Sequence, residues 1–260
     1  MSFYPILKAP GTRGWVTLCN FSPNNWEAPR NSDQLINVTW SSGSEWLTES
    51  LGVLAMDAVR TVTAQELASR VPEDALPLLS ITRTLPPPRS DALPKLDALQ
   101  TTVPAWRATL GLTTEYADTS YQGELDPFDP KSTLLTFGPF LQFGTGIENH
   151  LILLNIENSP FSRSAELEIY DADGLTLRGK FDVRSNEANV ISLDGLGFGP
   201  GDLPLFICRG MAAIPLYFSR TADGAFLSLE HTHPPASLVV HGKRWEVQKL
   251  LKNRWFAKVL

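Results

Sequence analysis

Apolar residues in this chain come in short runs separated by turn residues. The runs containing Leu167, Ile169 and Tyr170, and later Phe226, Leu227 and Leu229, alternate apolar with polar positions. Turn signals such as Asp173-Gly174 and Asp223-Gly224 separate such runs at hairpin spacing. This alternation is typical of antiparallel strands that bury one face and expose the other, so the pattern predicts an all-β protein.

A succession of similar blocks occurs twice along the chain, which indicates an internal repeat. The matching blocks, in chain order, are "GWVTLCNFS" with "NHLILLNIENS", "LINVTW" with "LEIYDADG", "ALPLLSI" with "DLPLFIC", and "LGLTTEYADTS" with "IPLYFSRTADG". The second pair also runs on to a shared acidic-Val-Arg ending, at Val59-Arg60 and Val183-Arg184. We therefore expect two diverged copies of one antiparallel β-sandwich unit, 1–145 and 146–240, packed together as a pseudo-dimer.

Two segments depart from the repeat. The first half carries a Pro-rich insertion at 82–106, which cannot form a central strand because proline lacks a backbone donor. We expect it to be a long loop that packs onto the fold. The linker at 131–148 contains Phe137, Phe140 and Phe143, and this bulk favours a strand or buried crossover over a flexible tether.

Composition narrows the function classes. The 260 residues carry a net charge of −6, which disfavours general nucleic-acid binding. Cys19 and Cys208 lie in apolar runs, and we expect both to be buried, reduced thiols. The N-terminus lacks a signal-peptide pattern and no apolar run is long enough to cross a bilayer, so a cytoplasmic location is expected.

The second half resembles a known family. The segments "LLNIENSPFSRSAELEIYDADG", "FDVRSNEANVISLDGL" and "DLPLFICRGMAAIPLYFSRTADGAFLSLEHT" are similar to the single sandwich unit of the bacterial sensory rhodopsin transducer family. The resemblance extends to the first half only through the internal repeat. It implies a soluble cytoplasmic oligomer that binds a protein partner or a small ligand, and it supplies no catalytic residues.

The sequence "LEHTHPP" suggests a metal site. On a strand, His231 and His233 project from the same face, so two imidazoles could share a divalent metal with Glu230 as a third ligand. The alternative interpretation is a polar strand end. A glycine-rich run from Gly195, "GLGFGPGD", is followed by a strand instead of a helix, which excludes a helix-terminal phosphate cradle.

Aromatic residues in the first half suggest a sugar-binding surface. Exposed Trp rings give pyranose rings a platform, with polar side chains beside them for the hydroxyl groups. The candidate ligand-binding residues are Trp26, Arg30, Asp33, Trp40 and Trp46. The alternative is that the Trp residues fill the core, since large aromatics dominate burial.

The tail, 241–260, is the one amphipathic helix that the sequence predicts. Leu250, Leu251 and Trp255 follow helical spacing, and we expect them to be buried against the sandwich. Its cations could instead dock an acidic protein partner or a membrane surface; they include Lys243, Arg244, Lys249, Lys252 and Arg254.

The expected function is a non-catalytic binding or interaction protein for a protein partner or a small ligand such as a glycan, with no cofactor. A metal-dependent enzyme centred on Glu230, His231 and His233 is the first alternative. A peripheral membrane adaptor that uses the C-terminal helix is the second. A homo-oligomer is compatible with each of these expectations.

Overall fold

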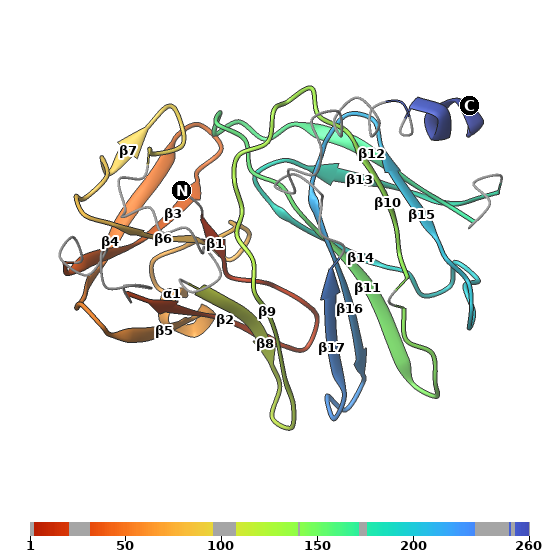
Figure 1. Ribbon diagram of the computed structural model, residues 1–260, viewed down its shortest axis with the longest axis horizontal. Coiled ribbons are helices and arrows are strands. Elements are labelled where there is room, and N and C mark those ends of the chain that lie inside the picture. Colours follow the sequence, from red (N-terminus) through yellow and green to blue (C-terminus); the bar gives the residue numbers. More distant parts are fainter. Residues whose placement is uncertain are drawn as a thin grey trace.

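The protein is built almost entirely of β-strands. A computed structural model describes residues 3–20, 32–95, 108–139, 141–171, 176–231, 250 and 253–259. Its strands form four antiparallel sheets, which confirms the all-β prediction (Figure 1). Within the described part of the chain, no helix has the length and apolar character needed to cross a membrane.

The first half contains two of the sheets and one short helix, α1 (Ala64–Leu67). One sheet has the order β1 (Tyr4–Pro5), β6 (Leu78–Thr82), β3 (Gln34–Ser41), β4 (Trp46–Leu54) and β7 (Arg89–Ser90). The other has the order β5 (Val59–Thr63), β2 (Arg13–Cys19), β8 (Ala108–Thr113) and β9 (Asp118–Tyr121). The Thr63 hydroxyl caps α1 by accepting a hydrogen bond from the amide of Glu66.

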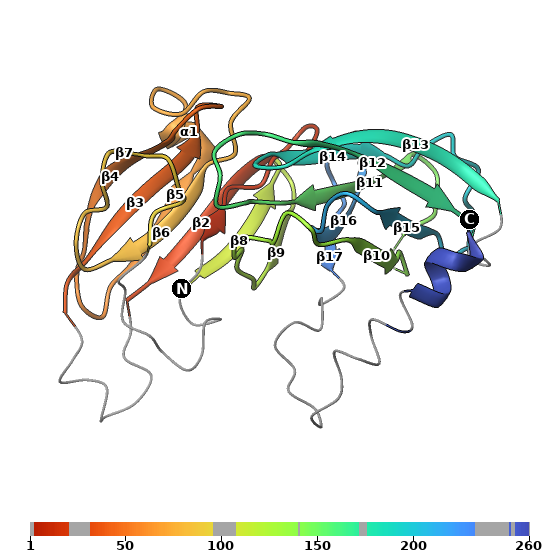
Figure 2. The ribbon, with the colours of Figure 1, turned by 90° about the horizontal axis from the view of Figure 1, so that it is seen from above.

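The second half contains the other two sheets, which lie beside the first half in Figure 2. One has the order β10 (Leu134–Phe137), β15 (Leu205–Cys208), β12 (Ser164–Tyr170) and β13 (Leu177–Arg184). The other has the order β14 (Ala188–Ser192), β11 (Ile147–Leu154), β16 (Ile214–Thr221) and β17 (Leu227–His231). The apolar core between them includes Leu151, Leu167, Phe206 and Tyr217.

Strand order is the same in both halves, apart from the additional β7. The order β1-β6-β3-β4 matches β10-β15-β12-β13, and β5-β2-β8-β9 matches β14-β11-β16-β17. The matched blocks at Ala75 and Asp202 lead into β6 and β15. The amide of Ile6 donates to the carbonyl of Pro77, and the amide of Gly138 donates to the carbonyl of Pro204, each at 2.9 Å.

One detail of the expected repeat is wrong. Val59-Arg60 begins β5, whereas Val183-Arg184 ends β13, so these residues are not equivalent. The equivalent positions are in the turns that follow β4 and β13. There, Asp57 (φ 58°) and Asn186 (φ 62°) adopt a positive φ, which is uncommon for residues other than glycine and favours Asn and Asp.

The boundary expected at residue 145 is also wrong. Strand β10 lies on the N-terminal side of that boundary but pairs with β15, where Leu134 is opposite Cys208. The chain therefore passes to the second half before Leu134. As predicted, the linker contains a strand, and it is part of the second half's own sheet.

The two halves share a continuous apolar contact, called here the seam. Leu151 and Leu153 of β11 face the core of the second half. Ile152 and Leu154 face the other way and join the core cluster of the first half. The second-half residues of the seam are Ile152, Leu154, Ile156, Ile214, Leu216, Phe218 and Leu229. Strands β11 and β16 are thus buried on both faces, whereas one exposed face was expected.

The loop between β11 and β12 closes one end of the seam with hydrogen bonds to the first half. The carbonyl of Ile156 accepts from the amide of Phe128 at 2.8 Å. The carbonyl of Asn158 accepts from the indole Nε1 of Trp46 at 2.9 Å and from the amide of Leu93 at 2.8 Å. These bonds fix the register of the loop on the first half.

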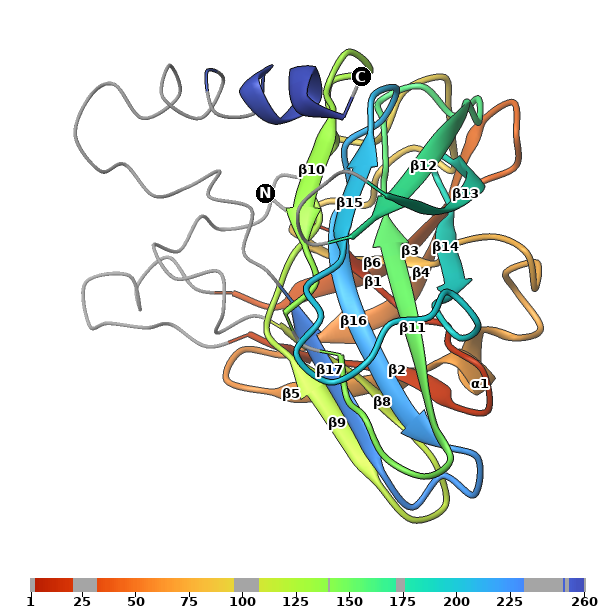
Figure 3. The same cartoon turned by 90° about the vertical axis from the view of Figure 1, so that its right-hand side faces the viewer.

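The C-terminal helix packs on the outer face of the β10-β15-β12-β13 sheet, where Figure 3 shows it lying across the ends of β10 and β15. Trp255, Phe256 and Val259 contact Tyr170, Leu205 and Ile207. The expected burial of Leu250 is wrong, because its side chain is 62% exposed. Arg254 is exposed, while Leu251, Lys243, Arg244, Lys249 and Lys252 lie outside the described residues.

We expect Trp255→Ala to destabilise the protein by about 1–2 kcal/mol, because the half-buried indole loses its contact with the sheet and its edge-to-face packing on Phe137. The matched change Leu250→Ala removes an exposed side chain and should cost less than about 0.5 kcal/mol. Urea unfolding of the two variants measures both values. Equal effects would contradict the docking described here.

Candidate functional site

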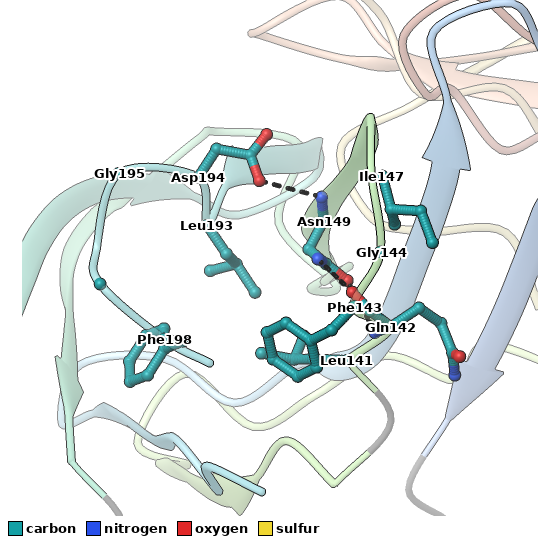
Figure 4. Close-up of a pocket in the computed structure, with 11 residues that line it drawn as sticks. Leu141, Gln142, Phe143, Gly144, Ile147, Asn149, Leu193, Asp194, Gly195 and Phe198 are labelled. Atoms are coloured by element: carbon teal, nitrogen blue, oxygen red, sulfur yellow. Dashed lines mark hydrogen bonds between the residues drawn. The ribbon is translucent and has the colours of Figure 1, made fainter. Parts of the chain in front are cut away.

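The second half contains a cavity of about 170 Å³ between two loops (Figure 4). One loop, 141–147, connects β10 to β11, and the other, 193–198, follows β14. Phe198 lies on one side of the hollow, and Phe143 and Leu141 lie on the other. Two aromatic rings from loops far apart in sequence therefore line the same space.

Asn149 holds the first loop in place. Its side chain is 7% exposed, and its Nδ2 donates to the carbonyl of Gln142 at 2.8 Å. Its Oδ1 accepts from the amide of Gln142 at 3.0 Å and from the hydroxyl of Ser219 at 2.7 Å. Because both Nδ2 and Oδ1 of Asn149 form hydrogen bonds, this side chain fixes the cavity wall to the sheet beneath it.

Asp194 holds the second loop at the edge of the cavity, with its carboxylate turned toward the backbone amide of Asn149 (Figure 4). Its Oδ1 accepts from the amide of Asn149 at 3.2 Å, and the amide of Leu193 donates to the carbonyl of Asn149 at 2.9 Å. The side chain is exposed to solvent, so the carboxylate is available to a ligand. Gly195 (φ 80°) and Gly197 (φ 77°) then turn the chain around the cavity in a conformation that favours glycine.

The predicted metal ligands do not come together among the described residues. Glu230 pairs with Tyr217 and His231 with Leu216, so the two neighbours project from opposite faces of β17. His231 packs edge-to-face on Tyr121 of β9, with the ring centroids 4.6 Å apart. Burial, with a smaller contribution from Glu124, raises the pKa of Tyr121. His233 lies outside the described residues, and within them no three His, Cys, Asp or Glu side chains form a metal-binding group.

The predicted tryptophan platform is wrong for the two Trp residues that the structure describes. Trp40 is 4% exposed and Trp46 is 1% exposed, so both are core residues. Asp33 instead caps a turn, where its Oδ1 accepts from the amide of Met56 at 2.9 Å. Trp26 and Arg30 lie outside the described residues.

Both cysteines are free thiols, as expected. Cys208 is buried in the core of the second half, whereas Cys19 is only half-buried, on the outer face of β2. Burial raises the pKa of both thiols and keeps them protonated at neutral pH, so neither has the thiolate character of a nucleophile.

The cavity residues were missed in the sequence because they come from separate loops. The glycine-rich run from Gly195 is not a phosphate cradle, but it forms one wall of the cavity. Comparison of the chain with models of known protein families, with curated proteins and with solved structures found no match to any of them.

Proposed function

We propose that the protein is a non-catalytic binding protein whose cavity, lined by Phe143, Phe198 and Asp194, holds a single sugar ring. The observation that carries this proposal is the placement of two aromatic rings and an exposed carboxylate around one hollow. Phenyl rings pack on the apolar C–H faces of a pyranose. A carboxylate accepts hydrogen bonds from two neighbouring hydroxyl groups.

The size of the cavity supports a small ligand. Pockets for drug-sized molecules occupy roughly 300–1,000 Å³. The cavity here, about 170 Å³, takes one ring and leaves the rest of a larger ligand in solvent. A terminal sugar of a glycan meets this requirement.

We also propose that the two halves are copies of one ancestral unit and that the protein acts in the cytoplasm. The common strand order supports the view that the halves are diverged copies of one β-sandwich unit. The sequence resemblance of the second half to the sensory rhodopsin transducer family implies a cytoplasmic binding protein, and we keep that role as part of the proposal. A metal-dependent activity gains no support from the described residues.

Titrating the protein with a panel of monosaccharides, followed by amide NMR, tests the proposed ligand. We expect saturable shifts at Gln142, Gly195 and Gly197. Phe198→Ala should weaken binding by about threefold to tenfold through lost ring packing. Asp194→Asn keeps an oxygen for the amide of Asn149 but removes the charge, and should weaken binding by about tenfold or more.

Two variants control for general damage. Phe161 is 59% exposed on another loop, and Asp182 is exposed on β13, so Phe161→Ala and Asp182→Asn should bind like the unmodified protein. Shifts that do not saturate for any sugar, or equal binding by Phe198→Ala, would refute the proposal.

A further inference from the structure

His150 is a buried imidazole at the seam between the halves. It lies on β11 on the same face as Ile152 and Leu154, which belong to the seam. The residue is 7% exposed, and its ring is stacked on Phe218 with the centroids 5.9 Å apart and the planes at 18°. Phe218 is itself a seam residue, so the imidazole is part of the contact between the halves.

Neither ring nitrogen of His150 has a hydrogen-bond partner within the described part of the chain. The nearest carboxylate oxygen, Oε2 of Glu148, is 3.9 Å from Nε2, which is beyond hydrogen-bond distance. That oxygen already accepts from Nε of Arg220 at 2.9 Å. A neutral imidazole tolerates this position better than a charged one, since a buried charge without a partner is costly.

Burial, and not the surrounding charges, decides the direction in which the pKa of His150 shifts. Burial lowers the pKa of His150, and Arg220 lowers it further, while Asp194 and Glu148 act in the opposite direction. The turn at residues 9–12 of the first half brings no titratable side chain to this cluster. Since the pKa in the folded protein lies below the ordinary value of about 6.5, folding stability is retained above that pH and falls as the solution becomes more acidic.

The Glu148–Arg220 ion pair connects His150 to the first half. The Arg220 guanidinium lies directly against the backbone of Gly11, where a Cβ atom would come within 1.9 Å of Nη1. Nearby, the Thr114 hydroxyl of the first half donates to the carbonyl of Gly224 at 2.7 Å. Protonated His150 would compete with Arg220 for Glu148 and would draw water into this contact.

We propose that His150 is an acid-sensitive switch at the seam: protonation of its imidazole loosens the contact between the two halves while each half keeps its own sheets. Above neutrality the neutral ring packs on Phe218 and the seam is closed. Under acidic conditions the imidazolium is stabilised by hydration, which requires the seam to part. The proposal does not depend on a ligand in the cavity.

Hydrogen exchange at the seam tests the switch. The amides of Leu93 and Phe128 bond across the seam to the β11–β12 loop. After correction for the intrinsic pH dependence of exchange, their opening should increase by up to about tenfold between pH 6.5 and pH 5.5. Amides shared by β12 and β13, inside the second half, should show no such increase. A parallel NMR titration of the His150 ring should follow the same curve.

His150→Phe keeps the stacked ring but cannot titrate, and should abolish the acid response at Leu93 and Phe128. If this variant fails to fold, His150→Gln removes the titrating ring as well and serves the same purpose. His231→Phe, which changes the histidine packed on Tyr121, should leave the response intact. An unchanged response in the His150 variants, or equal acceleration throughout β12 and β13, would overturn the proposal.

Discussion

Trp46→Ala is expected to destabilise the protein by about 4 kcal/mol, which lies within the range for truncating a buried tryptophan. Trp46 is among the largest fully buried side chains, with 1% of its surface exposed. Its truncation leaves a cavity and also removes the indole bond to the carbonyl of Asn158, which joins the halves. The predicted loss of stability therefore has two causes, the cavity left in the core and the broken hydrogen bond that helps to close the seam.

Urea unfolding measures this effect, and two further variants separate its parts. Trp46→Phe should cost less, because a ring still fills much of the space and only the bond to Asn158 is lost outright. Trp15→Ala changes a half-buried Trp on the outer face of β2 and should cost about 1–2 kcal/mol. If the Trp46 and Trp15 truncations were equally mild, Trp46 would not have the core role assigned to it.

Arg163→Ala is expected to cost about 3 kcal/mol, since it leaves a buried carboxylate without its cation. Glu157 is 2% exposed, and its two oxygens accept from Nε of Arg163 at 3.0 Å and from Nη2 at 2.5 Å. The Arg163 side chain is 39% exposed, so water can partly replace it. For that reason we place the cost at the lower end of the range for buried pairs.

An exposed pair provides the control. Arg89→Ala breaks a surface contact with Glu45 and should change stability by less than about 1 kcal/mol. The double change Arg163→Met with Glu157→Leu removes both charges and should recover much of the loss, because apolar residues can replace a buried ion pair. A double variant as unstable as Arg163→Ala would show that the loss comes from packing and not from the stranded charge.

The local sequence predicts where the strands lie, but it does not predict correctly which of their faces are buried. The blocks at Ala75 and Asp202 predicted β6 and β15 because the Pro-Leu start and the apolar run are local features. The exposed face expected for every strand was wrong for β11 and β16. Their continuous apolar runs, "HLILL" and "IPLYF", are the signal that both faces are covered, since alternation is lost when no face meets water.

The candidate site could not be derived from the sequence, because it depends on a contact between distant loops. Nothing local indicates that Phe143 and Phe198 line one cavity. The prediction of a tryptophan platform fails for a related reason, because an indole ring that can stack on a sugar is equally suited to a hydrophobic core. Only the burial of Trp40 and Trp46 in the structure shows that these two rings are core residues. The metal hypothesis placed His231 and His233 on one strand face with Glu230 as a third ligand, and the pairing of β17 places Glu230 on the opposite face from His231.

The seam has an evolutionary consequence. Every position of β11 from Asn149 to Leu154 is buried, whereas β2, its counterpart in the first half, buries only alternate positions. Residues on the outer face of β2 can therefore be replaced without disturbing a core. The same replacement at any of these positions of β11 disturbs the packing of one core or the other. If the halves descend from one ancestral unit, the second copy would have accepted mutations more slowly along its central strands and would preserve more of the ancestral sequence there.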